Sequence, residues 1–127
     1  MNILLVDDNA EYLQLLADML YANGYTIHTA CDGVEACDVL TSTDIDLIIS
    51  DIKMPRLDGI KLHGFARQME KHAQTKFIFI TAFNEVYQNT LQLDPKIDIF
   101  LEKSTNIKEI VQLVDKLMFG KFAGLWN

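Results

Sequence analysis

Short runs of apolar, mostly branched side chains alternate along this chain with longer stretches in which apolar residues recur at helical spacing. Such alternation is typical of an α/β fold, in which parallel strands are joined by helices that pack on the sheet. Several runs are almost continuously hydrophobic, as expected of strands that helices cover on both faces. The predicted strands span residues 2–6, 25–29, 46–50, 77–80 and 97–101. The sequence therefore predicts a five-stranded parallel sheet.

The stretches between the predicted strands carry apolar stripes. Residues at i, i+3, i+4 and i+7 line one face of a helix, and this spacing is followed by Leu13, Leu16, Ala17 and Leu20. It recurs in Leu62, Phe65, Ala66 and Met69, and again in Ile107, Ile110, Val111, Val114, Leu117 and Met118. The segment 84–93 is less regular, and Asp94-Pro95 ends it because a residue before proline disfavours the helical conformation. We expect core-facing helices in these stretches.

The length of the chain bounds its domain organisation. At 127 residues it suits one compact domain, since domains commonly contain about 100 to 150 residues. We predict one domain over residues 1–119 and a tail over residues 120–127. The tail contains Phe122, Leu125 and Trp126, which either pack back on the domain or bind a partner.

Charge and residue usage exclude several classes of function. The formal net charge of −7 disfavours nucleic acid and anionic membranes, which are bound largely through Lys and Arg. Acidic residues near the N-terminus are incompatible with a signal peptide, so we expect a cytoplasmic protein. Cys31 and Cys37 lack metal or redox spacing and are predicted to be reduced thiols. His28, His63 and His72 are predicted to be surface or half-buried imidazoles without a metal.

Polar residues stand where the predicted strands end. Asp7 and Asp8 follow the first strand, Asp51 follows the third, Thr81 follows the fourth, and Lys103 comes soon after the fifth. Each alone could be a helix cap, an ordinary strand residue or a solvated charge. Because ligands of open parallel sheets bind at the carboxyl ends of the strands, their coincidence at one edge favours a shared functional site.

The chemistry of these groups favours phosphoryl transfer. Carboxylates in one pocket repel one another, by about 1 kcal/mol per pair at 4 Å in water and about 4 kcal/mol at a surface-like dielectric constant. A divalent cation would relieve this repulsion, and oxygen ligands without Cys or His favour Mg²⁺. Thr81 and Lys103 add groups that stabilise charge on phosphoryl oxygens. We predict Asp51, which lies centrally, as a nucleophile that forms an acyl phosphate.

Four motifs resemble those of response-regulator receiver domains. Residues 51–59, Asp-Ile-Lys-Met-Pro-Arg-Leu-Asp-Gly, are similar to the D-x-x-M-P-x-x-D-G motif around the family's phosphoacceptor. The others are Val6-Asp7-Asp8-Asn9, Ile80-Thr81-Ala82 and Phe100-Leu101-Glu102-Lys103. The resemblance runs from Ile3 to about Met118. It implies a flavodoxin-like, doubly wound fold with strand order 2-1-3-4-5 and five flanking helices.

The resemblance also implies a metal site and a phosphoryl donor. Asp8 and Asp51 would ligate Mg²⁺ together with the backbone carbonyl of Lys53, while Asp7 would hold a metal-bound water. The donor would be a phosphohistidine on a sensor histidine kinase or a histidine phosphotransfer protein. The downstream protein target is not specified, and the chain would act as a monomer or as a phosphorylation-dependent homodimer.

A conformational switch is implied as well. Thr81 would bond a phosphoryl oxygen, and Lys103 would pair with the phosphoryl group on Asp51. In the family, movement of this threonine is coupled to an aromatic residue on the last strand, here Phe100, which turns inward. This inward movement would shift the equilibrium between two conformations of the face built by the fourth helix, fifth strand and fifth helix, where partners usually bind.

Two departures from the family pattern concern the chain around the fifth strand. Ser104 follows Lys103 where the family usually has proline with a cis bond, and a cis bond without proline costs about 2.5 to 4 kcal/mol. We therefore expect a trans or differently strained loop. Lys96-Ile97 replaces a small Gly-Ala pair, so that the fourth helix is expected to end early or to shift.

Two further departures concern aromatic residues. Phe83 and Lys53 line the approach to the phosphoryl group, and Phe83 is expected to lengthen the life of the acyl phosphate because it cannot orient an attacking water. Phe100 stands where tyrosine is frequent. Since it lacks the hydroxyl, its inward state would be held by packing alone.

Two other functions fit part of the pattern. A Mg²⁺-dependent phosphohydrolase of the haloacid-dehalogenase type would need a D-x-D motif, whereas the first strand ends in Asp7-Asp8-Asn9 and the chain has no cap domain. A degenerate receiver would be a phosphorylation-independent interaction domain. Ser104 and the irregular segment 84–93 favour it, while the complete acid set, Thr81 and Lys103 oppose it. We expect a module that catalyses its own phosphorylation and is not a multiple-turnover enzyme.

Overall fold

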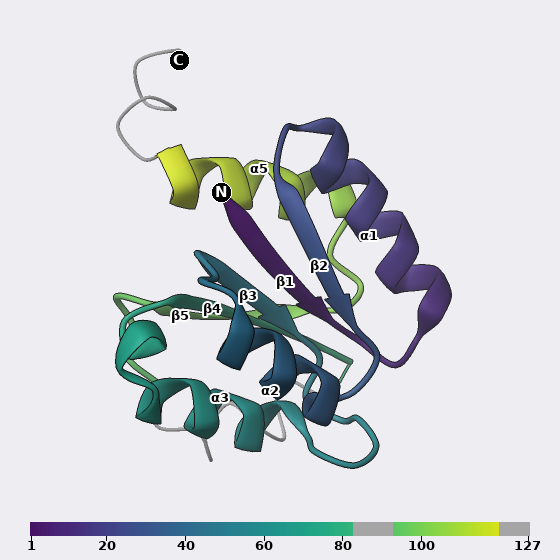
Figure 1. Cartoon of the computed structure of the whole chain (residues 1–127). Coiled ribbons are helices and arrows are strands. Elements are labelled where there is room, and N and C mark those ends of the chain that lie inside the picture. Colours follow the sequence, from purple (N-terminus) through teal and green to yellow (C-terminus); the bar gives the residue numbers. More distant parts are fainter. Residues whose placement is uncertain (83–92, 120–127) are drawn as a thin grey trace.

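The fold is a five-stranded sheet in the order β2-β1-β3-β4-β5, described here by a computed structural model over residues 1–82 and 93–119 (Figure 1). The strands are β1 (Asn2–Val6), β2 (Thr26–Ala30), β3 (Leu47–Ser50), β4 (Lys76–Thr81) and β5 (Asp98–Glu102). All four pairings are parallel. The predicted α/β class and strand order are confirmed, and each strand lies within one residue of its predicted bounds.

Four α-helices and one short 3₁₀ helix occur in the described part of the chain. They are α1 (Ala10–Ala22), α2 (Gly33–Ser42), α3 (Gly59–Gln68), the 3₁₀ helix η1 (Glu70–His72) and α5 (Ile107–Phe119). None of these helices is both long and apolar enough to cross a bilayer. The helix predicted at 84–93 falls, except for its last residue, outside the described residues, as do Phe83 and the tail at 120–127.

The sheet separates two apolar cores, because successive strand residues point to opposite faces. Ile3 and Leu5 of β1 belong to the core that α1 and α5 cover. Leu4 and Val6 belong to the core on the α2 and α3 side. Figure 1 shows the two pairs of helices on opposite sides of the sheet.

The start of β2 is set by the end of α1. Gly24 has a positive φ of 93°, a conformation that glycine adopts without steric cost and that commonly ends helices. The N–H of the next residue, Tyr25, donates to the carbonyl of Leu20 in α1 at 3.4 Å. Tyr25 is thereby engaged with the helix end, and the strand begins at Thr26, one residue later than predicted.

The buried face of α3 contains a histidine in place of an expected phenylalanine. Phe65 is 39% exposed, whereas His63 is 9% exposed. The His63 ring packs against Phe77 and Phe79 at centroid distances of 5.0 and 5.3 Å, and its Nε2 lies 3.0 Å from Asp98 Oδ1. The predictions that Phe65 faces the core and that His63 is a surface or half-buried imidazole are wrong, because a buried carboxylate supplies the partner that the imidazole needs.

The other two histidines differ in burial. His72 has no exposed surface, and its Nε2 accepts a hydrogen bond from the backbone N–H of Ile45 at 3.2 Å. This acceptor role requires a neutral ring, in keeping with the lowering of the pKa of His72 by burial. The prediction that His72 is a surface or half-buried imidazole is therefore wrong. His28 is half-buried, and Cys31 and Cys37 are free thiols, as predicted.

Candidate functional site

The predicted polar residues meet at the carboxyl edge of the sheet. Asp7 follows β1, Asp51 follows β3, Thr81 ends β4 and Lys103 follows β5. The N–H of Asp51 donates to the carbonyl of Val6, and the N–H of Lys103 donates to the carbonyl of Thr81, both at 2.9 Å. These two hydrogen bonds extend strand pairing by one residue and so fix where Asp51 and Lys103 leave the sheet.

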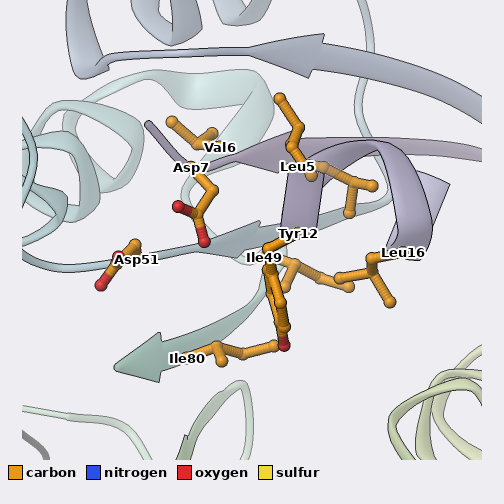
Figure 2. A pocket seen from close by; sticks show the side chains of 9 residues that line it. Leu5, Val6, Asp7, Tyr12, Leu16, Ile49, Asp51 and Ile80 are labelled. Carbon is orange, nitrogen blue, oxygen red and sulfur yellow. The ribbon is translucent and has the colours of Figure 1, made fainter. Parts of the chain in front are cut away.

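Asp7, Asp8 and Asp51 form an acidic cluster in which carboxylate oxygens of the three residues lie within 4.8 Å of one another. Asp7 is 4% exposed and Asp51 is 8% exposed, whereas Asp8 is open to solvent. Figure 2 shows the Asp7 and Asp51 side chains beyond the ends of neighbouring strands. Two buried like charges at this separation are unfavourable without a cation, so the acidic cluster depends on positive charge nearby.

Lys103 supplies positive charge to the acidic cluster. Its Nζ lies 2.9 Å from Asp7 Oδ2 and 3.2 Å from Asp51 Oδ2. The N–H of Asn9 donates to Asp7 Oδ1 at 2.9 Å, and the N–H of Ile52 donates to Asp51 Oδ1 at 2.7 Å. Each buried carboxylate is therefore held by a backbone N–H and by the same ammonium group.

The surroundings perturb the protonation of both Asp51 and Lys103. Burial raises the pKa of Asp51; the charge of Lys103 opposes this shift, and the charge of Asp7 adds to it. Burial alone would lower the pKa of Lys103, but its hydrogen bond to Asp7 and the charges of Asp51 and Asp7 outweigh that effect and raise the pKa. The lysine thus stays charged, while its charge only partly offsets the unfavourable effects of burial and of Asp7 on the ionised form of Asp51.

Asp51→Asn is expected to raise the free energy of unfolding at pH 7, by on the order of 1 kcal/mol, because it removes a buried charge that repels Asp7. Since the pKa is raised on folding, the penalty is absent below the usual aspartate pKa, grows as the pH rises toward the folded pKa, and is complete above it. Urea unfolding in EDTA at several pH values measures the difference. A difference that grows toward acidic pH would contradict this prediction.

Sequence comparison assigns the family. The sequence matches the response regulator receiver domain over residues 3–115. The chain belongs to this family.

Relatives of this receiver include longer proteins. The probable transcriptional regulator ycf27 of Cyanidium caldarium is 31% identical over 117 residues, which are 92% of this chain and 46% of that protein. The sensor kinase CckA of Brucella abortus is 32% identical over 120 residues, which are 91% of this chain and 12% of the kinase. The chain thus spans less than half of either protein.

A solved structure with the same architecture is that of the response regulator TrrA from Thermotoga maritima in complex with Mg²⁺ and BeF. It is 35% identical in sequence, with a TM-score of 0.77, and the match covers 91% of this chain and 97% of that one. The match therefore covers nearly the full length of that solved structure.

The loop between β3 and α3 of the receiver is built from close backbone contacts. The N–H of Gly59 donates to the carbonyl of Ile52 at 2.7 Å, and a Cβ on Gly59 would lie 2.2 Å from the carbonyl oxygen of Asp51. Within the loop, Arg56 has a φ of 68°, and its guanidinium pairs with Asp32 at 3.2 Å. The loop is thus tied to the N-cap residue of α2, and Gly59 packs directly against the backbone of Asp51.

The structure gives the positions of three other residues of the predicted site, Thr81, Lys53 and Phe100, but their predicted roles stay predictions. Thr81 is fully buried at the end of β4, next to Lys103 through the backbone. Lys53 is exposed, two residues beyond Asp51. Phe100 is half-buried in β5, with its ring 5.8 Å from that of Phe79. The Lys103-Ser104 bond is trans, since no peptide bond in the described part of the chain is cis.

Tyr12 is a residue of the site that the sequence analysis did not identify. The Lys103 Nζ lies over the Tyr12 ring, 4.9 Å from its centroid. Tyr12 also lines a pocket with Asp7, Asp51 and Ile80 (Figure 2). Its spacing could have indicated this position, because Tyr12 stands four residues before the buried Leu16 and therefore on the inward stripe of α1.

Proposed function

We propose that this receiver accepts a phosphoryl group on Asp51 in a two-component or phosphorelay system. The observation that supports the proposal best is the placement of Asp51, a nearly buried carboxylate between an ammonium group at 3.2 Å and two further carboxylates. A carboxylate whose ionised form is only partly compensated is suited to attack an electrophile. The neighbouring groups are suited to stabilise the negative charge that the transfer brings in.

The residues present fit a magnesium ion. Asp7, Asp8 and Asp51 offer oxygen ligands within 4.8 Å of one another, and Mg²⁺ prefers oxygen ligands and retains several waters. The exposure of Asp8 leaves one side open for such waters. When bound, Mg²⁺ would neutralise the acidic cluster and draw negative charge from the phosphoryl oxygens. Asp8 and Asp51 would be its direct ligands with the Lys53 carbonyl, and Asp7 would hold a bound water.

In the proposed transfer, an oxygen of Asp51 attacks the phosphorus of a phosphohistidine. A P–O bond forms, the N–P bond breaks, and the departing imidazole takes up a proton. Lys103 exchanges its contact with Asp51 for one with the incoming phosphoryl group and so offsets its charge. The product is a modified receiver, and each chain reacts once until its acyl phosphate is hydrolysed, which distinguishes it from a multiple-turnover enzyme.

The proposed donor is a sensor histidine kinase or a histidine phosphotransfer protein. This proposal is supported by the relationship to CckA, which is named a sensor kinase. We propose a cytoplasmic location, where such donors act. The output would be a changed binding surface. Thr81 would engage the phosphoryl group, and Phe100 would move from its contact with Phe79. The face around β5 and α5 would then favour a second conformation, which a downstream protein binds.

The proposed function is tested by incubating the protein with Mg²⁺ and acetyl phosphate and measuring its intact mass. We expect a gain of one phosphoryl group that EDTA and Asp51→Asn both abolish. Asp38→Asn makes the same chemical change at an exposed position on α2 and should leave the gain intact. Absence of any adduct would reject the proposal in favour of a phosphorylation-independent interaction domain, and repeated release of phosphate from esters would indicate a hydrolase.

A further inference from the structure

Tyr12 is held rigidly next to the acidic cluster by the start of α1. Its backbone N–H donates to the side-chain oxygen of Asn9 at 3.1 Å, and the N–H of Asn9 donates to Asp7 at 2.9 Å. An N-cap of this kind fixes the first turn of a helix. Tyr12 therefore has a defined position relative to Asp7, five residues away in sequence, before any contact of its ring is considered.

The part of Tyr12 that faces the site is its ring. Lys103 Nζ lies 4.9 Å from the ring centroid, whereas Figure 2 shows the hydroxyl at the Ile80 end of the pocket, away from the carboxylates of Asp7 and Asp51. The hydroxyl is buried and has no hydrogen-bond partner among the described residues. Burial raises the pKa of Tyr12, so the ring is that of a neutral phenol.

In the proposed transfer, Lys103 must stay in place while its hydrogen bonds change partners, so a contact that uses none of its N–H donors would help to position it. A lysine side chain is a flexible four-carbon stem that ends in three donors, and the residues after it, Ser104, Thr105 and Asn106, include no proline to stiffen the loop. Of its two present partners, Asp7 and Asp51, Asp51 is the carboxylate that is modified in the proposed reaction. An aromatic face attracts an ammonium through its quadrupole within about 6 Å. That attraction leaves donors available for other partners.

We propose that Tyr12 is a positioning residue for phosphoryl transfer: its ring face holds the Lys103 ammonium over Asp51 while the hydrogen bonds of that ammonium pass from the carboxylates to the phosphoryl oxygens. The inference rests on the proposed function and adds to it a residue that acts through Lys103. Tyr12 itself touches neither the donor nor the phosphoryl group.

Two substitutions separate the ring from the hydroxyl. Tyr12→Leu removes the aromatic face but retains apolar volume, and it is expected to slow phosphorylation by acetyl phosphate about three- to tenfold, as the loss of a partly exposed cation–π contact implies. Tyr12→Phe keeps the face and is expected to react within about twofold of wild type. Tyr21→Leu is the matched control, because Tyr21 lies on the same helix and is 74% exposed; it should not change the rate.

A double mutant shows whether Tyr12 acts through Lys103. On a Lys103→Gln background, Tyr12→Leu is expected to cause no further slowing, since the cation that the ring holds is gone. A purely structural role would slow both backgrounds equally and would overturn the inference. In the unphosphorylated protein, NMR provides an independent readout: the ring-current shift of the Lys103 methylene next to the ammonium should persist in Tyr12→Phe and disappear in Tyr12→Leu.

The outcomes distinguish this inference from the proposed function. If wild type is phosphorylated and Tyr12→Leu reacts at the same rate, the positioning role is overturned and the proposed function stands. If wild type takes up no phosphoryl group with Mg²⁺ and acetyl phosphate, the proposed function fails, and the role of Tyr12 in transfer fails with it.

Discussion

Asp98→Ala is expected to lower the free energy of unfolding by about 3–5 kcal/mol, the usual result of removing one partner from a buried ion pair. The Asp98 side chain is 1% exposed and pairs with Arg67 Nη2 at 2.6 Å and with His63 Nε2 at 3.0 Å. It also accepts the N–H of Asp94 at 2.8 Å. Alanine would leave these three donors, of which His63 is buried and Arg67 half-buried, without their acceptor and would disconnect α3 from the start of β5.

Urea unfolding at neutral pH measures this loss, with the transition midpoint falling while the slope stays unchanged. Asp44→Ala is the matched control, because Asp44 pairs with Lys71 at 3.7 Å but is 92% exposed, and exposed ion pairs contribute little. Its midpoint should equal that of wild type. A loss below about 1 kcal/mol for Asp98→Ala, the size expected of one ordinary hydrogen bond, would contradict our interpretation of Asp98 as the junction between α3 and β5.

Gly59→Ala is expected to damage both stability and phosphorylation. The new Cβ would lie 2.2 Å from the carbonyl oxygen of Asp51 and 2.9 Å from the Cα of Ile52, and both are backbone atoms that cannot rotate away. Overpacking of this kind typically costs about 1–3 kcal/mol. Because the contact presses on Asp51 itself, we also expect phosphorylation by acetyl phosphate to slow about 10²-fold, the effect of a displacement near 1 Å in a reacting group.

The control for Gly59→Ala lies in the same helix. A Cβ on Gly64 would meet no atom within 4 Å, so Gly64→Ala is expected to stabilise α3 by about 0.5–1 kcal/mol through the lower backbone entropy of alanine in the unfolded chain. Its phosphorylation rate should match wild type. If Gly59→Ala and Gly64→Ala had the same free energy of unfolding or the same phosphorylation rate, the close contact at Gly59 would not be the cause of the expected damage.

The strands and the edge that carries the site could be predicted because both depend on local pattern. Apolar runs end at Asp7 and Asp51, and these changes from apolar to acidic mark the carboxyl ends of β1 and β3 within a residue. The strand order came from resemblance to a family rather than from periodicity. A run of hydrophobic residues such as 47–50 does not specify which strand it will pair with.

The contacts that were missed join residues far apart in sequence. His63 and Asp98 are 35 residues apart, and nothing in the helical spacing of α3 specifies a carboxylate at the start of β5. Phe65 was expected to be inward on spacing alone, but the pairing with Asp98 favours burial of His63 instead. Tyr12 was overlooked for a similar reason: its importance comes from Lys103, at the opposite end of the chain.

The ion pair between Lys103 and Asp7 links residues 96 positions apart, and β5, which delivers the lysine, pairs only with β4 in the described sheet. Contacts of such separation form late, because closing the intervening loop costs entropy that is recovered only once neighbouring structure exists. A nascent chain that already contains Asp51 but lacks β5 has the acidic residues without their lysine. Completion of the site around Asp7, Asp51 and Lys103 is therefore expected to be a late event in folding.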